Sequence, residues 1–204
     1  MNVEKLIYRA NCFCVERKYS IALRIYEKIL KSNPNNKDAH RGKKSCLFGL
    51  KRYDKLIAIC DKTLKIDPKN FRVIEEKISC LRNLGKHKQA LKLNAYYLKI
   101  RPYYFHALFD RGIIAYQLKK YSESIKAFNL ALHRKANGYK RDEFHKRDLG
   151  YAHVHMGNAW KKLGKNDKAK DEYVWAMQAW PRKDIAFFMR IILKELDEIK
   201  KTHS

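Results

Sequence analysis

Three stretches of the sequence end in the same way and decide the fold. They read YEKILKSNPNN (residues 26–36), CDKTLKIDPKN (60–70) and NAYYLKIRPYY (94–104), and each has apolar residues at helical spacing before a proline. The prolines, Pro34, Pro68 and Pro102, follow one another at intervals of 34 residues. A fixed period of this length indicates a chain built from stacked copies of one structural unit.

The period extends over most of the chain. Five units superimpose on it, and the fifth places Pro181 at the position of the other prolines. Residues 139–149 interrupt the register between the fourth and the fifth unit, and we expect them to form a longer loop or an N-terminal extension of the next helix. We number the units repeats 1 to 5, and they start near residues 3, 37, 71, 105 and 150.

Each repeat contains two amphipathic stretches separated by a short polar turn, such as LKRYDK (50–55) in repeat 2 and LGKNDK (163–168) in repeat 5. The spacing of apolar residues is helical in both stretches, which predicts antiparallel helix pairs stacked side by side. The second stretch presents a small or apolar residue near its start, at Ala22, Leu56, Ala90, Ser124 and Ala169.

The repeats resemble tetratricopeptide repeats, a family of 34-residue helix pairs. The resemblance covers about residues 3–182 and implies an all-α, right-handed superhelix of about five helix-turn-helix repeats. Repeat 2 departs most from the pattern because it has Lys44 where a small residue is typical, so we expect its helices to be splayed. Repeat 5 matches best, with Gly157, Trp160, Leu163, Gly164, Ala169, Tyr173, Ala176 and Pro181.

The chain is expected to end in a capping helix. We assign residues 1–181 to the repeat array and residues 182–204 to the capping helix and tail. A terminal repeat cannot leave its apolar face in water, and this last segment carries a helical apolar stripe. The stripe consists of Ile185, Phe188, Ile192 and Leu196.

The charge of the chain is strongly positive. It has 46 Lys and Arg against 21 Asp and Glu, a formal net charge of +25, which favours nucleic acid, acidic membrane surfaces or acidic protein partners. A row of cations, Arg9, Lys43, Lys77 and Arg111, follows the repeat, and each is either a contact for a polyanion or a long side chain packed on the next helix. The most concentrated basic segment is the insert, whose candidates for binding RNA are Lys140, Arg141, Lys146 and Arg147. A solvated loop is the alternative there.

The resemblance implies that ligands bind in the concave groove lined by the first helix of each repeat. The clamp that some relatives use for chaperone carboxylate tails is not expected, because Ile7, Gly42 and Glu76 occupy its positions and only Asn11 matches. We expect Phe109, Tyr116 and Arg82 to anchor a partner. By register, the groove residues are Asn11, Arg41, Ser45, Glu75, Ser79, Arg82, Asn83, Phe109, Asp110, Tyr116, Asn158, Lys161 and Lys162.

Cysteine placement follows the repeat in part. Cys12, Cys46 and Cys80 recur every 34 residues. Equivalent positions in stacked repeats are about 10 Å apart, too far for a disulfide or a shared metal, so we interpret them as packing residues. Cys14 and Cys60 have no partner in this pattern. The odd count points to a reducing compartment.

No catalytic motif or phosphate-binding loop is found in the sequence. His145, His153 and His155 cluster near the insert, but residues two apart on a helix point to different faces, so no metal site is expected. We expect no catalytic residue and no cofactor. The sequence also has no targeting or membrane-inserting segment, which predicts a cytoplasmic protein.

These observations predict a non-enzymatic scaffold or adaptor that binds a protein or peptide in its groove. A basic helical-repeat protein that binds RNA or a ribonucleoprotein is the alternative.

Overall fold

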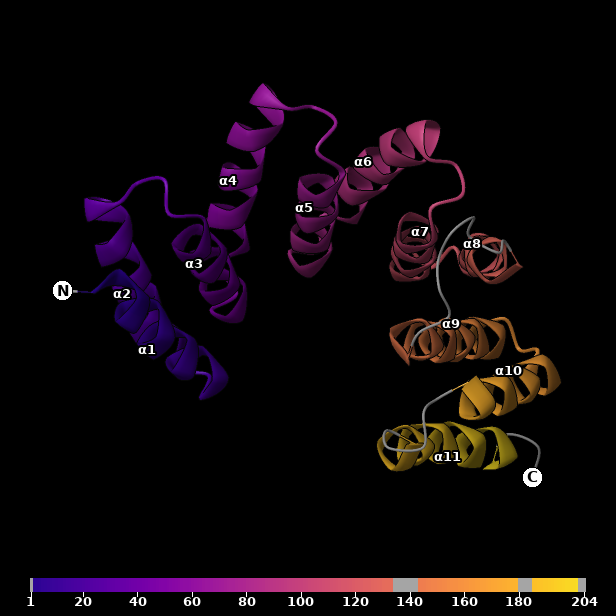
Figure 1. Ribbon diagram of the computed structural model, residues 1–204. Coiled ribbons are helices and arrows are strands. Elements are labelled where there is room, and N and C mark those ends of the chain that lie inside the picture. The colour runs from indigo at the N-terminus through magenta and orange to yellow at the C-terminus, as the bar shows by residue number, and fades with distance from the viewer. Residues whose placement is uncertain (1, 134–142, 180–184, 202–204) are drawn as a thin grey trace. The chain divides into compact units, whose positions relative to one another are not determined.

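The computed structural model describes residues 2–133, 143–179 and 185–201, and these are helical apart from short turns (Figure 1). The chain divides into two compact units, Met1–Lys86 and His87–Ser204, which we call the N-terminal unit and the C-terminal unit. The predicted all-α class is confirmed, because no strand occurs in the described ranges.

The described part of the N-terminal unit contains five helices. Helix α2 packs on both α1 and α3, and α4 packs on α3 and α5. The bounds are α1 Val3–Val15, α2 Tyr19–Ser32, α3 Lys37–Gly49, α4 Tyr53–Ile66 and α5 Phe71–Asn83.

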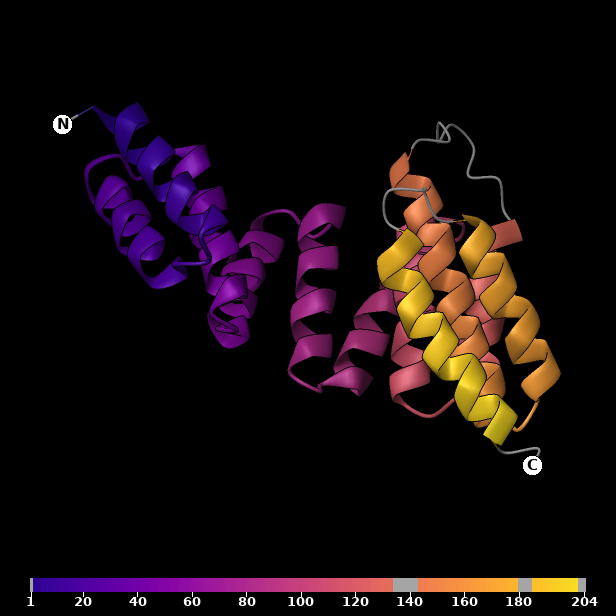
Figure 2. The ribbon, with the colours of Figure 1, turned by 90° about the horizontal axis from the view of Figure 1, so that it is seen from below.

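The C-terminal unit contains six described helices. Each packs on the next one along the chain, and Figure 2 shows α9, α10 and α11 side by side. The bounds are α6 His87–Ile100, α7 Phe105–Gln117, α8 Tyr121–His133, α9 Glu143–Lys162, α10 Asn166–Ala179 and α11 Ile185–Lys201.

The structure describes part of the insert. Helix α9 begins at Glu143, so residues 143–149 extend the first helix of repeat 5 at its N-terminal end. Residues 139–142 lie outside the described residues.

Asparagine side chains cap all three first helices of the N-terminal unit, and Asn2 does so for α1 through the backbone N–H of Glu4. The side-chain oxygen of Asn36 accepts a hydrogen bond from the backbone N–H of Ala39 at 2.8 Å. That of Asn70 accepts one from the backbone N–H of Val73 at 3.3 Å. Such caps satisfy N–H groups that have no partner within the helix, so α3 and α5 begin just after the turn that contains the proline.

The turn between the two helices of each repeat has a left-handed residue at one fixed position. Gly85 and Gly164 occupy it in repeats 3 and 5, with φ of 71° and 72°. Arg17, Lys51 and Lys119 occupy it in the other three, with φ of 59°, 56° and 60°. Left-handed backbone is unfavourable for residues with a Cβ atom, so three of the five turns carry local strain.

Close helix packing in repeat 4 depends on a glycine. A Cβ atom at Gly112 would lie 2.6 Å from the ring of Phe128, so only glycine lets α7 and α8 approach so closely. In repeat 2 the same two positions hold a large residue, Lys44, and a small one, Cys60. Helices α3 and α4 pack less extensively than α1 and α2, as the sequence predicts.

Helix α11 lies in the segment that the sequence assigns to a capping helix. Its Ile192 and Ile199 are buried against Ala169, Tyr173 and Ala176 of α10, so the last repeat does not expose this apolar surface. Among the described residues, no helix has both the length and the apolar composition needed to cross a membrane.

Candidate partner-binding site

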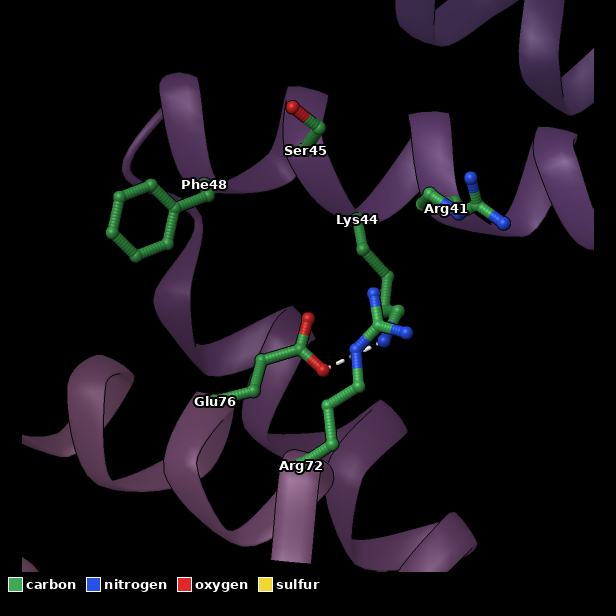
Figure 3. Close-up of a pocket in the computed structure, with 6 residues that line it drawn as sticks. All are labelled: Arg41, Lys44, Ser45, Phe48, Arg72 and Glu76. Carbon is green, nitrogen blue, oxygen red and sulfur yellow. Dashed lines mark hydrogen bonds and ion pairs between the residues drawn. The ribbon is translucent and has the colours of Figure 1, made fainter. Parts of the chain in front are cut away.

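A pocket of about 360 Å³ opens between α3 and α5 in the N-terminal unit, and we call it the α3–α5 pocket (Figure 3). Both helices are the first helices of their repeats. The family resemblance implies that ligands bind in a groove lined by these first helices. The lining residues are Arg41, Lys44, Ser45 and Phe48 of α3, with Arg72 and Glu76 of α5.

Helical spacing brings these side chains to one surface. The other three residues of α3 lie three, four and seven positions after Arg41, and the two residues of α5 lie four apart. Residues at these intervals share one face of a helix. The pocket is therefore formed by two neighbouring helix faces and not by a loop.

An ion pair lies inside the pocket. The ammonium nitrogen of Lys44 donates to a carboxylate oxygen of Glu76 at 2.6 Å, and both side chains are about three-quarters buried, with relative exposures of 28% and 25% (Figure 3). This pair neutralises Glu76, the one acidic residue of the lining. Lys44 also lines a second pocket of about 420 Å³ that has Leu30, Ile59 and Val73 in its wall.

Two further cations of the pocket are exposed to solvent, Arg41 and Arg72. Arg41 lies 3.5 Å from Asp38 in an ion pair whose partners are both more than 60% exposed, so water and salt weaken it strongly. Three cations thus line the pocket against one carboxylate. The pocket is electropositive and suits an anionic group.

Phe48 adds an apolar surface at the same place. Its side chain is 42% exposed. Its ring packs edge-on against that of Tyr53, with centroids 5.3 Å apart and an interplanar angle of 73°. This contact holds an exposed aromatic ring in a defined orientation.

Of the groove residues predicted in the N-terminal unit, Arg41 and Ser45 line the pocket, whereas others are engaged locally. Asn11 accepts a hydrogen bond from the hydroxyl of Tyr26 at 2.6 Å, and Asn83 donates to the backbone oxygen of Ser79 at 2.8 Å. Glu75 and Arg82 are half-buried on α5 and lie outside the lining.

The predicted anchors of the C-terminal unit pack against neighbouring rings. Phe109 lies edge-on to Phe128 at 5.4 Å, and Tyr116 lies edge-on to Tyr121 at 5.4 Å. Burial, followed by the nearby charge of Tyr121, raises the pKa of Tyr116. Both rings are therefore part of the packing between helices, and Asp110 is half-buried beside Phe109.

Three predicted groove residues near the end of α9 differ in their surroundings. Asn158 accepts a hydrogen bond from the hydroxyl of Tyr173 at 2.7 Å. Lys161 forms ion pairs with Glu195 at 2.7 Å and Glu198 at 2.6 Å, which tie α9 to α11. Lys162 is exposed.

The row of cations that follows the repeat is used in part for packing between repeats. Lys43 pairs with Glu27 of the preceding repeat at 3.1 Å, and Lys77 pairs with Asp61 at 2.5 Å. The guanidinium of Arg9 lies 5.8 Å from the ring centre of Phe13. The contacts of Lys43 and Lys77 favour the packing interpretation for these two members of the row, whereas Arg9 contacts a ring of its own helix.

The four insert residues predicted to bind RNA cannot be placed as a site. Lys140 and Arg141 lie outside the described residues. Lys146 and Arg147 belong to the first turns of α9, but their side chains lie outside the described part.

Cys14 has a neighbouring thiol that the repeat pattern does not indicate. Its sulfur lies 3.4 Å from that of Cys46, and the two residues are 32 positions apart, so the 34-residue period does not reveal the pair. The sequence analysis also missed Lys44, Phe48 and Arg72 as pocket residues. Their spacing of three and four from Arg41, Ser45 and Glu76 is the signal that could have found them.

A family model described as tetratricopeptide repeat matches residues 16–71 and 81–139, together more than half of the chain. No curated protein matches the sequence. Two solved structures similar to the chain are MamA 41-end from Desulfovibrio magneticus and TTC0263, a thermophilic TPR protein in Thermus thermophilus.

The MamA structure has a TM-score of 0.63 and 17% identity and covers 88% of this chain and 96% of its own. TTC0263 has a TM-score of 0.67 and 15% identity and covers 94% of this chain and 99% of its own. At such identities the likeness shows the fold alone, whereas the family model rests on the sequence. The chain belongs to the tetratricopeptide repeat family.

Proposed function

We propose that the chain is a non-enzymatic adaptor that holds an acidic segment of a partner protein in the α3–α5 pocket. Tetratricopeptide repeat proteins are in general protein-interaction scaffolds without enzymatic activity. The observation that carries the proposal is the pocket itself, because it combines exposed cations with an exposed ring between two first helices.

The charge of the pocket selects the partner's chemistry. Arg41 and Arg72 are exposed, and a guanidinium group can donate two parallel hydrogen bonds to one carboxylate. The single acidic residue, Glu76, is already paired with Lys44 and repels an incoming carboxylate less than a free carboxylate would. Glu or Asp side chains of a partner therefore fit this surface better than cations do.

The ring of Phe48 selects for an apolar neighbour in the same partner segment. A side chain that covers this ring buries apolar surface, which is worth about 25 cal/mol per Å². Aromatic and arginine side chains are enriched among the residues that dominate binding energy at protein interfaces. The preferred segment thus carries acidic residues next to an aliphatic or aromatic residue.

A peptide library displayed on phage and selected on the immobilised full-length chain tests this proposal. We expect selected peptides to be enriched in Asp and Glu with one apolar residue nearby. Reversing the pocket charge with Arg41→Glu and Arg72→Glu should weaken a selected peptide at least about tenfold, the equivalent of about 1.4 kcal/mol.

The control is a pair of substitutions that makes the same change in net charge at positions outside the pocket. Arg24→Glu on α2 and Lys55→Glu on α4 replace exposed cations of second helices. Equal weakening by the control pair would show a general electrostatic effect of the basic chain. Enrichment of basic peptides, or of none, would overturn the pocket as a site for acidic segments.

RNA binding is the second candidate, and the net charge of +25 favours it. Contacts with phosphates make affinity fall steeply with salt concentration, because bound cations are released from the nucleic acid. If RNA is the ligand, replacing Lys140, Arg141, Lys146 and Arg147 by Ala should flatten the dependence of log affinity on log salt for mixed RNA. An unchanged slope would exclude the insert as the RNA contact.

A further inference from the structure

The sulfur atoms of Cys14 on α1 and Cys46 on α3 lie 3.4 Å apart. The two helices belong to consecutive repeats and pack on one another. All five cysteines lie among the described residues. In that part of the chain the contact between the sulfurs of Cys14 and Cys46 joins repeat 1 to repeat 2.

We propose that Cys14 and Cys46 form a reversible disulfide when the protein meets a peroxide, and that this bond joins repeat 1 to repeat 2. The inference is independent of the function proposed for the α3–α5 pocket. It assigns a modification site to a pair of residues that the repeat pattern does not connect.

The geometry suits bond formation. A disulfide has a sulfur–sulfur distance of about 2 Å, so the two sulfurs need to approach by about 1.4 Å. Rotation about the Cα–Cβ bonds moves a sulfur by this order of distance while the backbone stays in place. Cys14 is half-buried and Cys46 is buried, so a small oxidant reaches Cys14 first.

The surroundings of Cys46 give the same order of events. Burial, together with the hydrogen bond and charge of Cys14, raises the pKa of Cys46 to about 12. Cys46 is therefore a poor first nucleophile toward peroxide, and it reacts second, when the adjacent sulfenic acid of Cys14 offers a leaving oxygen that takes up the thiol proton. The hydroxyl of Tyr26 lies 3.9 Å from the sulfur of Cys14 and donates its proton to Asn11.

The reaction has two balanced steps. The thiolate of Cys14 attacks one oxygen of hydrogen peroxide, the O–O bond breaks, and Cys14 becomes a sulfenic acid while hydroxide leaves and takes up a proton as water. The sulfur of Cys46 then attacks the sulfur of Cys14, the S–O bond breaks, and the thiol proton leaves with the hydroxide as a second water. Two thiols and one peroxide thus give one disulfide and two waters, and a dithiol reductant reverses the bond by exchange.

Peptide mapping of the full-length chain tests the inference. The protein is treated with hydrogen peroxide, free thiols are alkylated, and the chain is digested with trypsin without reductant. Cleavage after Arg9, Arg17, Lys44 and Lys51 releases residues 10–17, which contain Cys12 and Cys14, and residues 45–51, which contain Cys46. We expect these two peptides joined through one disulfide, which lowers the summed mass of the reduced peptides by two hydrogen atoms, with one alkyl group on the remaining cysteine of residues 10–17, and separated again by a dithiol.

Two variants identify the sulfur that reacts. In Cys12→Ser the joined peptide should persist, because Cys14 is then the single cysteine of residues 10–17. In Cys14→Ser it should disappear, and in the control Cys60→Ser, which removes a buried thiol elsewhere, it should remain. Fragmentation of the joined wild-type peptide locates the bond even if a variant does not fold.

Three results would overturn the inference. The joined peptide could be absent after complete oxidation of the half-buried thiols to higher acids. It could be joined through Cys12, or it could arise only between two chains, which a non-reducing gel would show as a dimer band.

Discussion

The ammonium nitrogen of Lys44 lies 2.6 Å from a carboxylate oxygen of Glu76, and this ion pair joins the first helices of repeats 2 and 3 inside the α3–α5 pocket. Lys44 occupies the position where repeat 4 has Gly112. Lys44 departs from the repeat pattern in the helix pair of repeat 2, and it contacts repeat 3 through Glu76.

Removing one partner of this pair should destabilise the chain. Lys44→Met keeps most of the side-chain volume but leaves the mostly buried carboxylate of Glu76 without a counter-charge, which should lower the free energy of unfolding by about 1–2 kcal/mol. Urea unfolding followed by circular dichroism measures this. Arg41→Met is the control, because its pair with Asp38 is exposed, and it should cost less than about 0.5 kcal/mol. Equal costs for both variants would contradict a structural role of the Lys44–Glu76 pair.

Glycine at the left-handed turn positions should stabilise the protein. Lys51 and Lys119 have φ of 56° and 60°, and replacing either by Gly relieves a strain of about 1 kcal/mol, offset partly by the greater freedom of the unfolded chain. We expect a higher midpoint of thermal unfolding for Lys51→Gly and for Lys119→Gly. The matched change Lys28→Gly, on the exposed face inside α2, should lower the midpoint because glycine disfavours a helix. A lower midpoint in the two turn variants would contradict the claim that the backbone is strained at Lys51 and Lys119.

A methyl group at Gly42 should disturb the packing between repeats 1 and 2. The ring of Tyr26 occupies the space that a Cβ atom at Gly42 would need. Gly42→Ala should therefore cost about 1–2 kcal/mol of unfolding free energy, although alanine is the better helix former. A double-mutant cycle with Tyr26→Leu checks the cause, since the cost of Gly42→Ala should be smaller once the ring is gone. An unchanged cost would mean that the ring is not what excludes the methyl group.

Stability should fall as the pH rises above about 9. Burial, as the first cause, raises the pKa of Cys46 and Cys60 to about 12 and that of Cys80 to about 11, from an ordinary thiol value of about 9. The unfolded chain then releases these protons at a lower pH than the folded chain, so the stabilisation is complete below about pH 8.5 and is lost as pH approaches the raised values.

Thermal unfolding in reductant at pH 8 and pH 10.5 measures this effect. Each buried thiol should lower the free energy of unfolding by about 1 kcal/mol for each unit that the pH rises in this range. Cys80→Ala should show a smaller loss between the two pH values than the wild-type chain, whatever its stability at pH 8. The same loss in both proteins would contradict a raised pKa of Cys80.

The architecture could be predicted from the sequence because the signal is repeated. The spacing of Pro34, Pro68 and Pro102 sets the register, and helical periodicity within each unit sets the helix pairs. Arg41 and Ser45, which line the α3–α5 pocket, could be assigned to one face of the first helices for the same reason, since their register is shared by the first helices of all repeats.

Contacts that depend on one repeat only could not be predicted in this way. Lys161 was expected to face a ligand, yet it pairs with Glu195 and Glu198, because the capping helix stands outside the period. Cys14 and Cys46 escape detection because side chains that meet across two helices are not at equivalent positions. Such pairs depend on how two helices are rotated relative to one another, and the repeat period gives no information on this rotation.

Site-specific photo-crosslinking tests most directly whether a partner protein binds in the α3–α5 pocket. A photo-reactive amino acid replaces Ser45, which lines the pocket, or Ser20, also an exposed serine, on α2, which serves as the control. After irradiation in nuclease-treated lysate, mass spectrometry identifies the attached segment. We predict an acidic protein segment attached at position 45, absent at position 20 and lost when Arg41→Glu and Arg72→Glu are added. Equal labelling at both positions, or labelling that occurs only when the nuclease is omitted, would contradict a protein-binding pocket between α3 and α5.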